Sequence, residues 1–133
     1  MALGDLMVLN RKGKVDLTTG PLVNSCVIDT CLREVRIAAL PPSAQPDSAQ
    51  CQSTGFERFT GADAYRFLLQ LACGLESEIA GETEILGQIK QNWRDFEIAD
   101  PAAAKSLRPW MQRLLQETKE IRSEFVVGLG SAT

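Results

Sequence analysis

The chain has 133 residues, 44% of them hydrophobic, which is enough for one globular domain with a core and too short for two ordinary domains. Its formal net charge of −3 argues against a general nucleic-acid-binding surface, which needs an excess of Lys and Arg, and leaves room for one local RNA contact. The sequence has no signal peptide and no apolar run approaching about 18 residues, so we expect a cytoplasmic protein without a membrane partner.

Four cysteines and the lack of any histidine limit the chemistry of the chain. The cysteines are too sparse for a disulfide scaffold and match no common zinc pattern, so we expect free thiols and no metal site. Cys31 has the strongest claim to reactivity, because the guanidinium of Arg33 favours the nucleophilic thiolate. Cys26 and Cys73 lie in apolar segments and are expected in the core, whereas Cys51 is expected in a flexible loop.

The first half of the chain predicts strands. Residues 6–9 indicate a short strand that runs into a turn, and the apolar stretch 22–28 indicates a second. Residues 35–39 alternate apolar and other side chains, which is typical of a half-buried strand and places Cys31 in a turn between strands. Residues 41–58 are rich in Pro, Ser and Gln and have almost nothing to bury, so we expect a mobile loop there.

The second half predicts three helices. The first opens with a capping box at Thr60 and ends near Gly74, and the second carries an apolar stripe over 85–96. The third begins after Asp100–Pro101. Its expected inward residues are Leu107, Trp110, Met111, Leu114, Leu115, Thr118, Ile121 and Phe125. Strands followed by helices predict an α+β fold, with a small, mainly antiparallel sheet and three main helices packed on one face.

The run 74–88 places polar and acidic residues around three glycines, where a buried helix would carry apolar residues. Glu84 and Gln88 are one turn apart on one flank of the second helix, with Glu82 near its start and Ser77 in the preceding turn. These side chains suit a site for one polar ligand. Alternatively, the acids complement the helix dipole and the glycines form a tight bend, and spacing alone does not decide between the two.

Three segments together carry a family resemblance: Thr30 to Val35, Gly74 to Lys90 and Lys119 to Glu124. In order and approximate spacing they resemble glutamyl-tRNA reductase. The match covers most of 22–133, is most specific over 81–90, and corresponds to the N-terminal catalytic domain of that family, as a divergent or truncated member.

The resemblance implies an oxidoreductase of tetrapyrrole biosynthesis, the route to porphyrins and heme, that converts glutamyl-tRNA into glutamate-1-semialdehyde. In the family, a cysteine attacks the ester carbonyl of glutamyl-tRNA, and NADPH reduces the resulting thioester. A glutamate substrate needs carboxylates for its ammonium group and an Arg fork for its carboxylate. The resemblance makes Cys31 the nucleophile, and the implied substrate contacts are Thr30, Arg33, Ser77, Glu82, Thr83, Glu84 and Gln88.

The family continues into an NADPH-binding domain and a helical dimerisation domain. We therefore expect 1–133 to be a single catalytic domain and 126–133 to be the start of a linker to an NADPH-binding domain absent from this chain. The glycines Gly128 and Gly130 are not a dinucleotide fingerprint, which needs a preceding strand and a following helix. NADPH is thus implied by the family and not expected to bind here, and a homodimer or a separate NADPH-binding polypeptide remain open as partners.

Two positions differ from the family pattern. Leu32 stands where the family has Asn, and Phe67 stands where the family has a histidine. These differences favour an alternative: a non-catalytic paralogue that acts as a ligand-binding or regulatory interaction module. A third hypothesis is a thiol redox sensor built on Cys31 and Cys26, although their separation of five residues does not promise bridging geometry.

Overall fold

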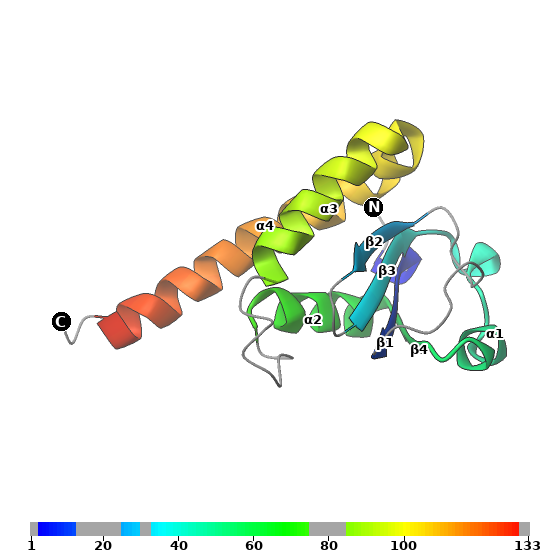
Figure 1. Cartoon of the computed structure of the whole chain (residues 1–133), viewed down its shortest axis with the longest axis horizontal. Helices are drawn as coiled ribbons and strands as arrows, with labels where there is room; N and C mark the ends of the chain where they lie inside the picture. The colour runs from blue at the N-terminus through cyan, green and yellow to red at the C-terminus, as the bar shows by residue number, and fades with distance from the viewer. Residues whose placement is uncertain (1–2, 13–24, 30–32, 75–84, 131–133) are drawn as a thin grey trace.

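The computed structural model describes the backbone of residues 3–12, 25–29, 33–74 and 85–130 (Figure 1). Its four strands are β1 (Leu6–Lys12), β2 (Cys26–Asp29), β3 (Arg33–Ala39) and β4 (Glu57–Thr60). They form one sheet in the order β2-β3-β1-β4, and each neighbouring pair is antiparallel. The three strands expected before residue 40 are therefore confirmed, and β4 is an addition.

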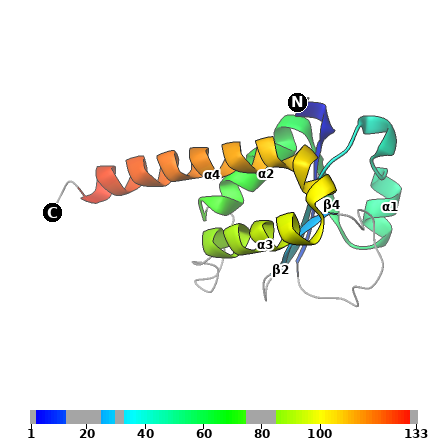
Figure 2. The same ribbon diagram turned by 90° about the horizontal axis from the view of Figure 1, so that it is seen from above.

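Helices cover the sheet unequally. They are α1 (Ser48–Ser53), α2 (Gly61–Ala72), α3 (Ile85–Ala99) and α4 (Pro101–Gly130), with short 3-10 turns η1 (Leu3–Asp5) and η2 (Pro42–Ala44). Figure 2 shows α2, α3 and α4 on one side of the sheet and α1 on the other. The α+β class, the antiparallel sheet and the three main helices on one face are confirmed.

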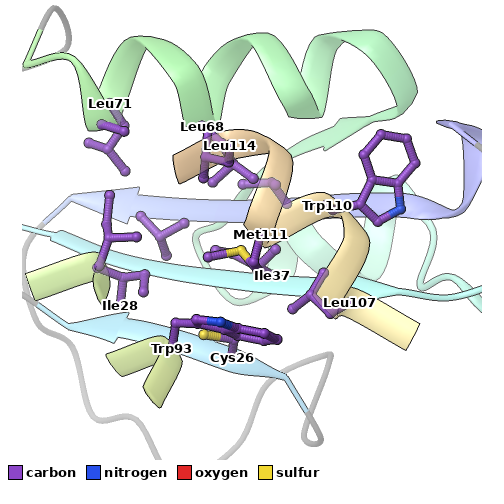
Figure 3. Packing of buried hydrophobic residues seen from close by; sticks show 14 of the residues in the cluster. Cys26, Ile28, Ile37, Leu68, Leu71, Trp93, Leu107, Trp110, Met111 and Leu114 are labelled. Atoms are coloured by element: carbon purple, nitrogen blue, oxygen red, sulfur yellow. The ribbon is translucent and has the colours of Figure 1, made fainter. Parts of the chain in front are cut away.

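The main core lies between the sheet and the three long helices. Apolar residues at helical spacing on α2, α3 and α4 are buried against alternate residues of β1, β2 and β3. Figure 3 shows part of this packing, with Leu68, Leu71, Trp93, Met111 and Leu114 from the helices and Cys26, Ile28 and Ile37 from the strands. Each buried side chain of this size contributes roughly 1.5–3 kcal/mol. The apolar stripe expected over 85–96 is confirmed, because Ile85, Ile89 and Trp93 are buried.

The starts of two helices test the expected caps. At α4, Asp100 Oδ1 accepts a hydrogen bond from the backbone N–H of Ala103 at 3.2 Å, so this helix begins as expected. Thr60 is indeed the residue before α2, but its side chain makes no capping hydrogen bond, so the expected capping box was wrong. The helix ends at Ala72, and Gly74 follows with a φ of +85°, the left-handed conformation that glycine adopts at low cost after a helix.

The far half of α4 extends beyond the sheet (Figure 1). Leu114 and Thr118 are fully buried, whereas Ile121 is 40% exposed, so the expectation that Ile121 faces the core was wrong. One helical turn further along the helix there is no sheet left to pack against. The backbone of 126–130 continues this helix, and the linker role assigned to 126–133 stays a prediction.

The segment 41–58 is not the loop that its composition predicts, because it forms η2, α1 and the start of β4. A capping box begins α1: Asp47 Oδ1 accepts from the N–H of Gln50 at 2.8 Å, and Gln50 Oε1 accepts from the N–H of Asp47 at 2.9 Å. Cys51 and Phe56 are buried, which corrects the expectation of an exposed, flexible Cys51. These two side chains form a second cluster with Met7 and Leu9 of β1.

This second cluster buries the other face of the sheet, so the expectation of a half-buried strand at β3 was wrong. Glu34 of β3 accepts hydrogen bonds from Arg11 Nη2 at 2.9 Å and from Arg36 Nε at 2.7 Å. Both guanidinium groups lie over the ring of Phe56, at 4.3 and 4.9 Å from its centroid. The charged residues that alternate with the apolar ones are thus enclosed as an ion cluster beneath α1.

Candidate functional site

Polar side chains gather at one end of the sheet, on the face covered by the long helices. Along β1, the inward residues change from apolar to Asn10 and Lys12. In the sheet register, Lys12 lies opposite Arg33 of β3, and Asn10 lies opposite Glu57 of β4. This end of the sheet is also where β2 stops at Asp29 and β3 begins.

These strand ends and α2 enclose a pocket of about 390 Å³, which we call the sheet-end pocket. Its lining contains three cations, two carboxylates, two amides and two phenyl rings. The lining residues are Asn10, Lys12, Arg33, Glu57, Phe59, Asp63, Arg66, Phe67 and Gln70. A pocket of this composition suits a ligand that carries charged groups and an apolar part.

Two aromatic rings form the apolar wall of the sheet-end pocket. Phe59 and Phe67 stack with their centroids 4.6 Å apart and an interplanar angle of 13°. Phe67 is 7% exposed and occupies the position at which the resemblance places a family histidine. A phenyl ring neither accepts nor donates a proton, so this wall supplies no acid or base.

Arg33 and Gln88 are the two expected substrate contacts that the structure describes. Arg33 lines the sheet-end pocket and is only 4% exposed, which brings a permanent positive charge into a largely enclosed position. Gln88 lies in the first turns of α3, outside the pocket lining, and its Nε2 donates a hydrogen bond to the carbonyl oxygen of Asp29 at 2.8 Å. The two residues therefore sit beside the two flanks of the segment that contains Cys31.

The other expected site residues fall outside the described part of the chain. These residues are Thr30, Cys31, Ser77, Glu82, Thr83 and Glu84, together with Leu32. Their roles stay predictions. The structure describes the chain on both sides of them, and the hydrogen bond from Gln88 to Asp29 brings the start of α3 next to the end of β2.

The described cysteines have surroundings that differ from those of a nucleophile. Cys26 is fully buried in the core, as expected, and burial raises the pKa of its thiol to about 12. Burial also raises the pKa of Cys51, against an opposing effect of Arg58. Cys73 is half-buried just after α2, so it is less enclosed than expected. The high pKa and burial of Cys26 argue against its use as a redox partner for Cys31.

Comparison with known families decides the assignment. A family model described as "Glutamyl-tRNAGlu reductase, N-terminal domain" matches residues 22–125. The chain belongs to this family. The match includes Arg33, Phe67 and Gln88, so the glutamyl-tRNA reductase resemblance of the sequence and the site at the sheet end concern the same residues.

Individual glutamyl-tRNA reductases match over shorter parts of their length. Glutamyl-tRNA reductase 2 of Anaeromyxobacter sp. (strain Fw109-5) is 40% identical over 68 residues, which are 51% of this chain and 16% of that protein. Glutamyl-tRNA reductase of Pyrobaculum neutrophilum is 29% identical over 111 residues, which are 78% of this chain and 27% of that protein. The chain thus spans less than a third of the length of these relatives. No solved structure matches.

The sheet-end pocket contains residues that reasoning from the sequence missed, among them Asn10, Lys12 and Arg66. Asn10 and Lys12 precede the part of the chain that the family model matches. A signal was present in both elements: inward positions of a strand turn polar at its end, and Asp63, Arg66 and Gln70 recur at three- and four-residue spacing beside Phe67. Polar residues at positions that should face a core are typical of a site.

Proposed function

We propose that this chain is the thioester-forming part of a glutamyl-tRNA reductase, with Cys31 as the nucleophile. The Cys31 sulfur attacks the ester carbonyl of glutamyl-tRNA, a C–S bond forms, and the C–O bond to the terminal ribose breaks. The tRNA leaves with its ribose hydroxyl, which takes up the proton. The observation that carries the proposal is the position of Arg33, which lies in an enclosed pocket two residues from Cys31 in a chain of this family.

The glutamyl group of this substrate retains two charged groups, because only its α-carboxylate is esterified. Its side-chain carboxylate matches the guanidinium of Arg33, which binds carboxylates through paired hydrogen bonds. Its ammonium group matches the carboxylates of Glu82 and Glu84. Thr30, Ser77 and Thr83 are proposed as further substrate contacts, and Gln88 as the residue that holds the start of α3 against the nucleophile's segment.

The family implies reduction of the thioester by NADPH, and the described residues do not fit that cofactor. A dinucleotide fingerprint requires a strand, a glycine turn and a helix within a parallel βαβ unit. Every strand pairing that the structure describes is antiparallel, and Gly128 and Gly130 lie within α4. The proposed reduction to glutamate-1-semialdehyde in porphyrin biosynthesis therefore needs NADPH from another domain or polypeptide, and a homodimer is a further proposed assembly.

The proposed setting of this chemistry is the cytoplasm. In the described ranges, no helix is both long enough and apolar enough to cross a membrane.

To test the proposed function, the chain is incubated with glutamyl-tRNA and its intact mass is measured. We expect a mass increase of one glutamyl group in the wild type and none in Cys31→Ser. Cys73→Ser is the matched control, because Cys73 is also accessible in part, and it should acquire the group as the wild type does. A wild type that gains no mass, or a Cys31→Ser variant that still gains it, would contradict the catalytic proposal.

Replacing Gln88 with leucine should slow acyl transfer by about three- to tenfold, which is the effect of losing one hydrogen bond of about 0.5–1.5 kcal/mol. The variant loses the bond to the Asp29 carbonyl and keeps an exposed position on α3, so its melting temperature should stay unchanged. The initial rate of adduct formation measures the effect. Gln91→Leu is the control, because Gln91 is exposed on the same helix and bonds only to Asp95 among the described residues. Equal rates in both variants would remove Gln88 from the site.

A binding or regulatory module is the second candidate function, and Phe67 is the observation that favours it. A phenyl ring at the wall of the pocket supplies no proton transfer, which typically contributes 10²- to 10⁴-fold to a rate. Calorimetry with free glutamate separates the two candidates. Binding that depends on Arg33, without an adduct on Cys31 from glutamyl-tRNA, would support the module.

A further inference from the structure

The sheet-end pocket holds groups that a glutamyl moiety does not use. Its volume of about 390 Å³ lies in the range of about 300–1,000 Å³ that is typical of small-molecule sites. A glutamyl group is aliphatic, so it has no use for the stacked rings of Phe59 and Phe67. It also has one remaining carboxylate, whereas the pocket presents the cations of Lys12, Arg33 and Arg66.

The aromatic wall suits a planar ring. Phe59 is half-buried, so part of its ring is accessible, while Phe67 supports it from behind in an almost parallel stack. Nucleobases stack on phenyl rings in proteins that bind single-stranded ends of RNA. The Phe59 ring is therefore a platform for one base.

The charges of the pocket are graded from its inside to its rim. Arg33 is 4% exposed, whereas Lys12 and Arg66 are exposed side chains. A phosphate, which stays partly hydrated, fits the exposed cations of the rim. The carboxylates of Glu57 and Asp63 on the same lining are acceptors for ribose hydroxyls, as acidic residues are in nucleotide sites.

Asn10 adds a possible base contact at this wall. It is 1% exposed, and its Nδ2 donates to Glu57 Oε1 at 3.0 Å. Among the residues that the structure describes, its buried Oδ1 has no hydrogen-bond partner. A buried acceptor without a partner is costly, and the exocyclic amino group of adenine is a donor that asparagine side chains recognise.

We propose that the sheet-end pocket binds the 3′-terminal adenosine nucleotide of the aminoacyl-tRNA, with the base on Phe59 and the phosphate at Lys12 and Arg66. This inference rests on the proposed function, because the ester that Cys31 attacks joins the glutamyl group to the ribose of that nucleotide. Arg33 is two residues from Cys31, and two residues span at most about 7 Å. The terminal nucleotide must therefore lie beside the part of the pocket that Arg33 lines.

Titration of the full chain with adenosine 5′-monophosphate, followed by NMR or calorimetry, tests the pocket. We expect saturable binding that is at least tenfold weaker in Arg66→Glu and unchanged in Arg94→Glu, which alters an exposed arginine of α3 outside the pocket. Phe59→Leu removes the stacking ring and should weaken binding about tenfold. Inosine 5′-monophosphate, ribose 5-phosphate and glutamate should each bind more weakly than the adenosine nucleotide. Failure of the nucleotide to bind, equal binding by Arg66→Glu, or tighter binding of glutamate would overturn the proposal.

A competition experiment separates the tRNA end from a free nucleotide. Uncharged tRNA should displace the bound adenosine nucleotide, and the same tRNA without its terminal adenosine should not. Displacement by both RNAs, or by neither, would overturn the assignment to the tRNA end. Cys31→Ser should bind the nucleotide as the wild type does, so loss of nucleotide binding with an intact glutamyl adduct on Cys31 would remove this inference and leave the proposed function standing.

Discussion

Replacing Phe67 with histidine is expected to raise the rate of acyl transfer to Cys31 by about 10²-fold, the lower end of what a placed acid or base contributes. Phe67 lines the sheet-end pocket at the position of a family histidine, so an imidazole there would lie near the reacting groups. The variant should also gain a pH dependence near the ordinary histidine pKa of about 6.5, because the neutral imidazole is the base. Initial rates of adduct formation between pH 5 and 8 measure both effects.

The histidine variant has a cost in stability that needs a control. Phe67 is buried and stacked on Phe59, so replacing its ring with a polar one should lower the free energy of unfolding by about 1–3 kcal/mol. Phe67→Leu removes the ring without adding a titratable group. If the leucine and histidine variants transfer the glutamyl group at equal rates, the position does not take part in proton transfer.

Replacing Glu34 with alanine is expected to lower the free energy of unfolding by about 3–5 kcal/mol, because it leaves two buried guanidinium groups without their counter-charge. Glu34 bonds to Arg11 at 2.9 Å and to Arg36 at 2.7 Å, and the three side chains are at most 9% exposed. A loss of this size is a large fraction of the stability of an ordinary domain. Urea denaturation followed by circular dichroism measures it.

Glu97→Ala is the matched control for the buried ion cluster. Glu97 pairs with Arg108 at 3.2 Å, but these side chains are 32% and 41% exposed, so its loss should cost no more than about 1 kcal/mol. A loss in Glu34→Ala no larger than that in Glu97→Ala would show that the cluster beneath α1 does not stabilise the fold.

The same cluster gives stability a defined pH dependence. Burial tends to raise the pKa of Glu34, but its hydrogen bonds and attraction to Arg36 and Arg11 outweigh burial and hold the pKa below its ordinary value of 4.5. The stabilisation is therefore complete above that ordinary value and is lost as the pH falls through the lower folded pKa. Below about pH 4.5, the stability gap between wild type and Glu34→Gln should narrow as the pH falls. A gap that stays constant on acidification would contradict this origin.

The sequence predicts the helical side of this fold well because its signal is local. Buried residues such as Ile89 and Trp93 recur at helical spacing, and Asp100 carries a cap at its expected place. The other face was missed because segment 41–58 offers only Cys51 and Phe56 to bury, too few for a periodic pattern. Their partners are on β1, more than 40 residues earlier, and long-range packing of this kind leaves no local trace.

The candidate site divides in the same way. Arg33 and Gln88 came from motifs of the family, and the structure places them in the pocket and against Asp29. The remainder of the pocket joins β1, β4 and α2, and only the register of Asn10 with Glu57 brings these segments together. Single side chains such as Arg66 look like ordinary surface residues until that register is known.

The most direct test of the central claim is the position of the glutamyl group after reaction with glutamyl-tRNA. The reaction is quenched with acid, the chain is digested, and the modified peptide is identified by tandem mass spectrometry. We expect the group on Cys31, as a thioester that hydroxylamine removes. A hydroxylamine-labile group on Cys26, Cys51 or Cys73 in place of Cys31, or no glutamylated cysteine at all, would contradict the account.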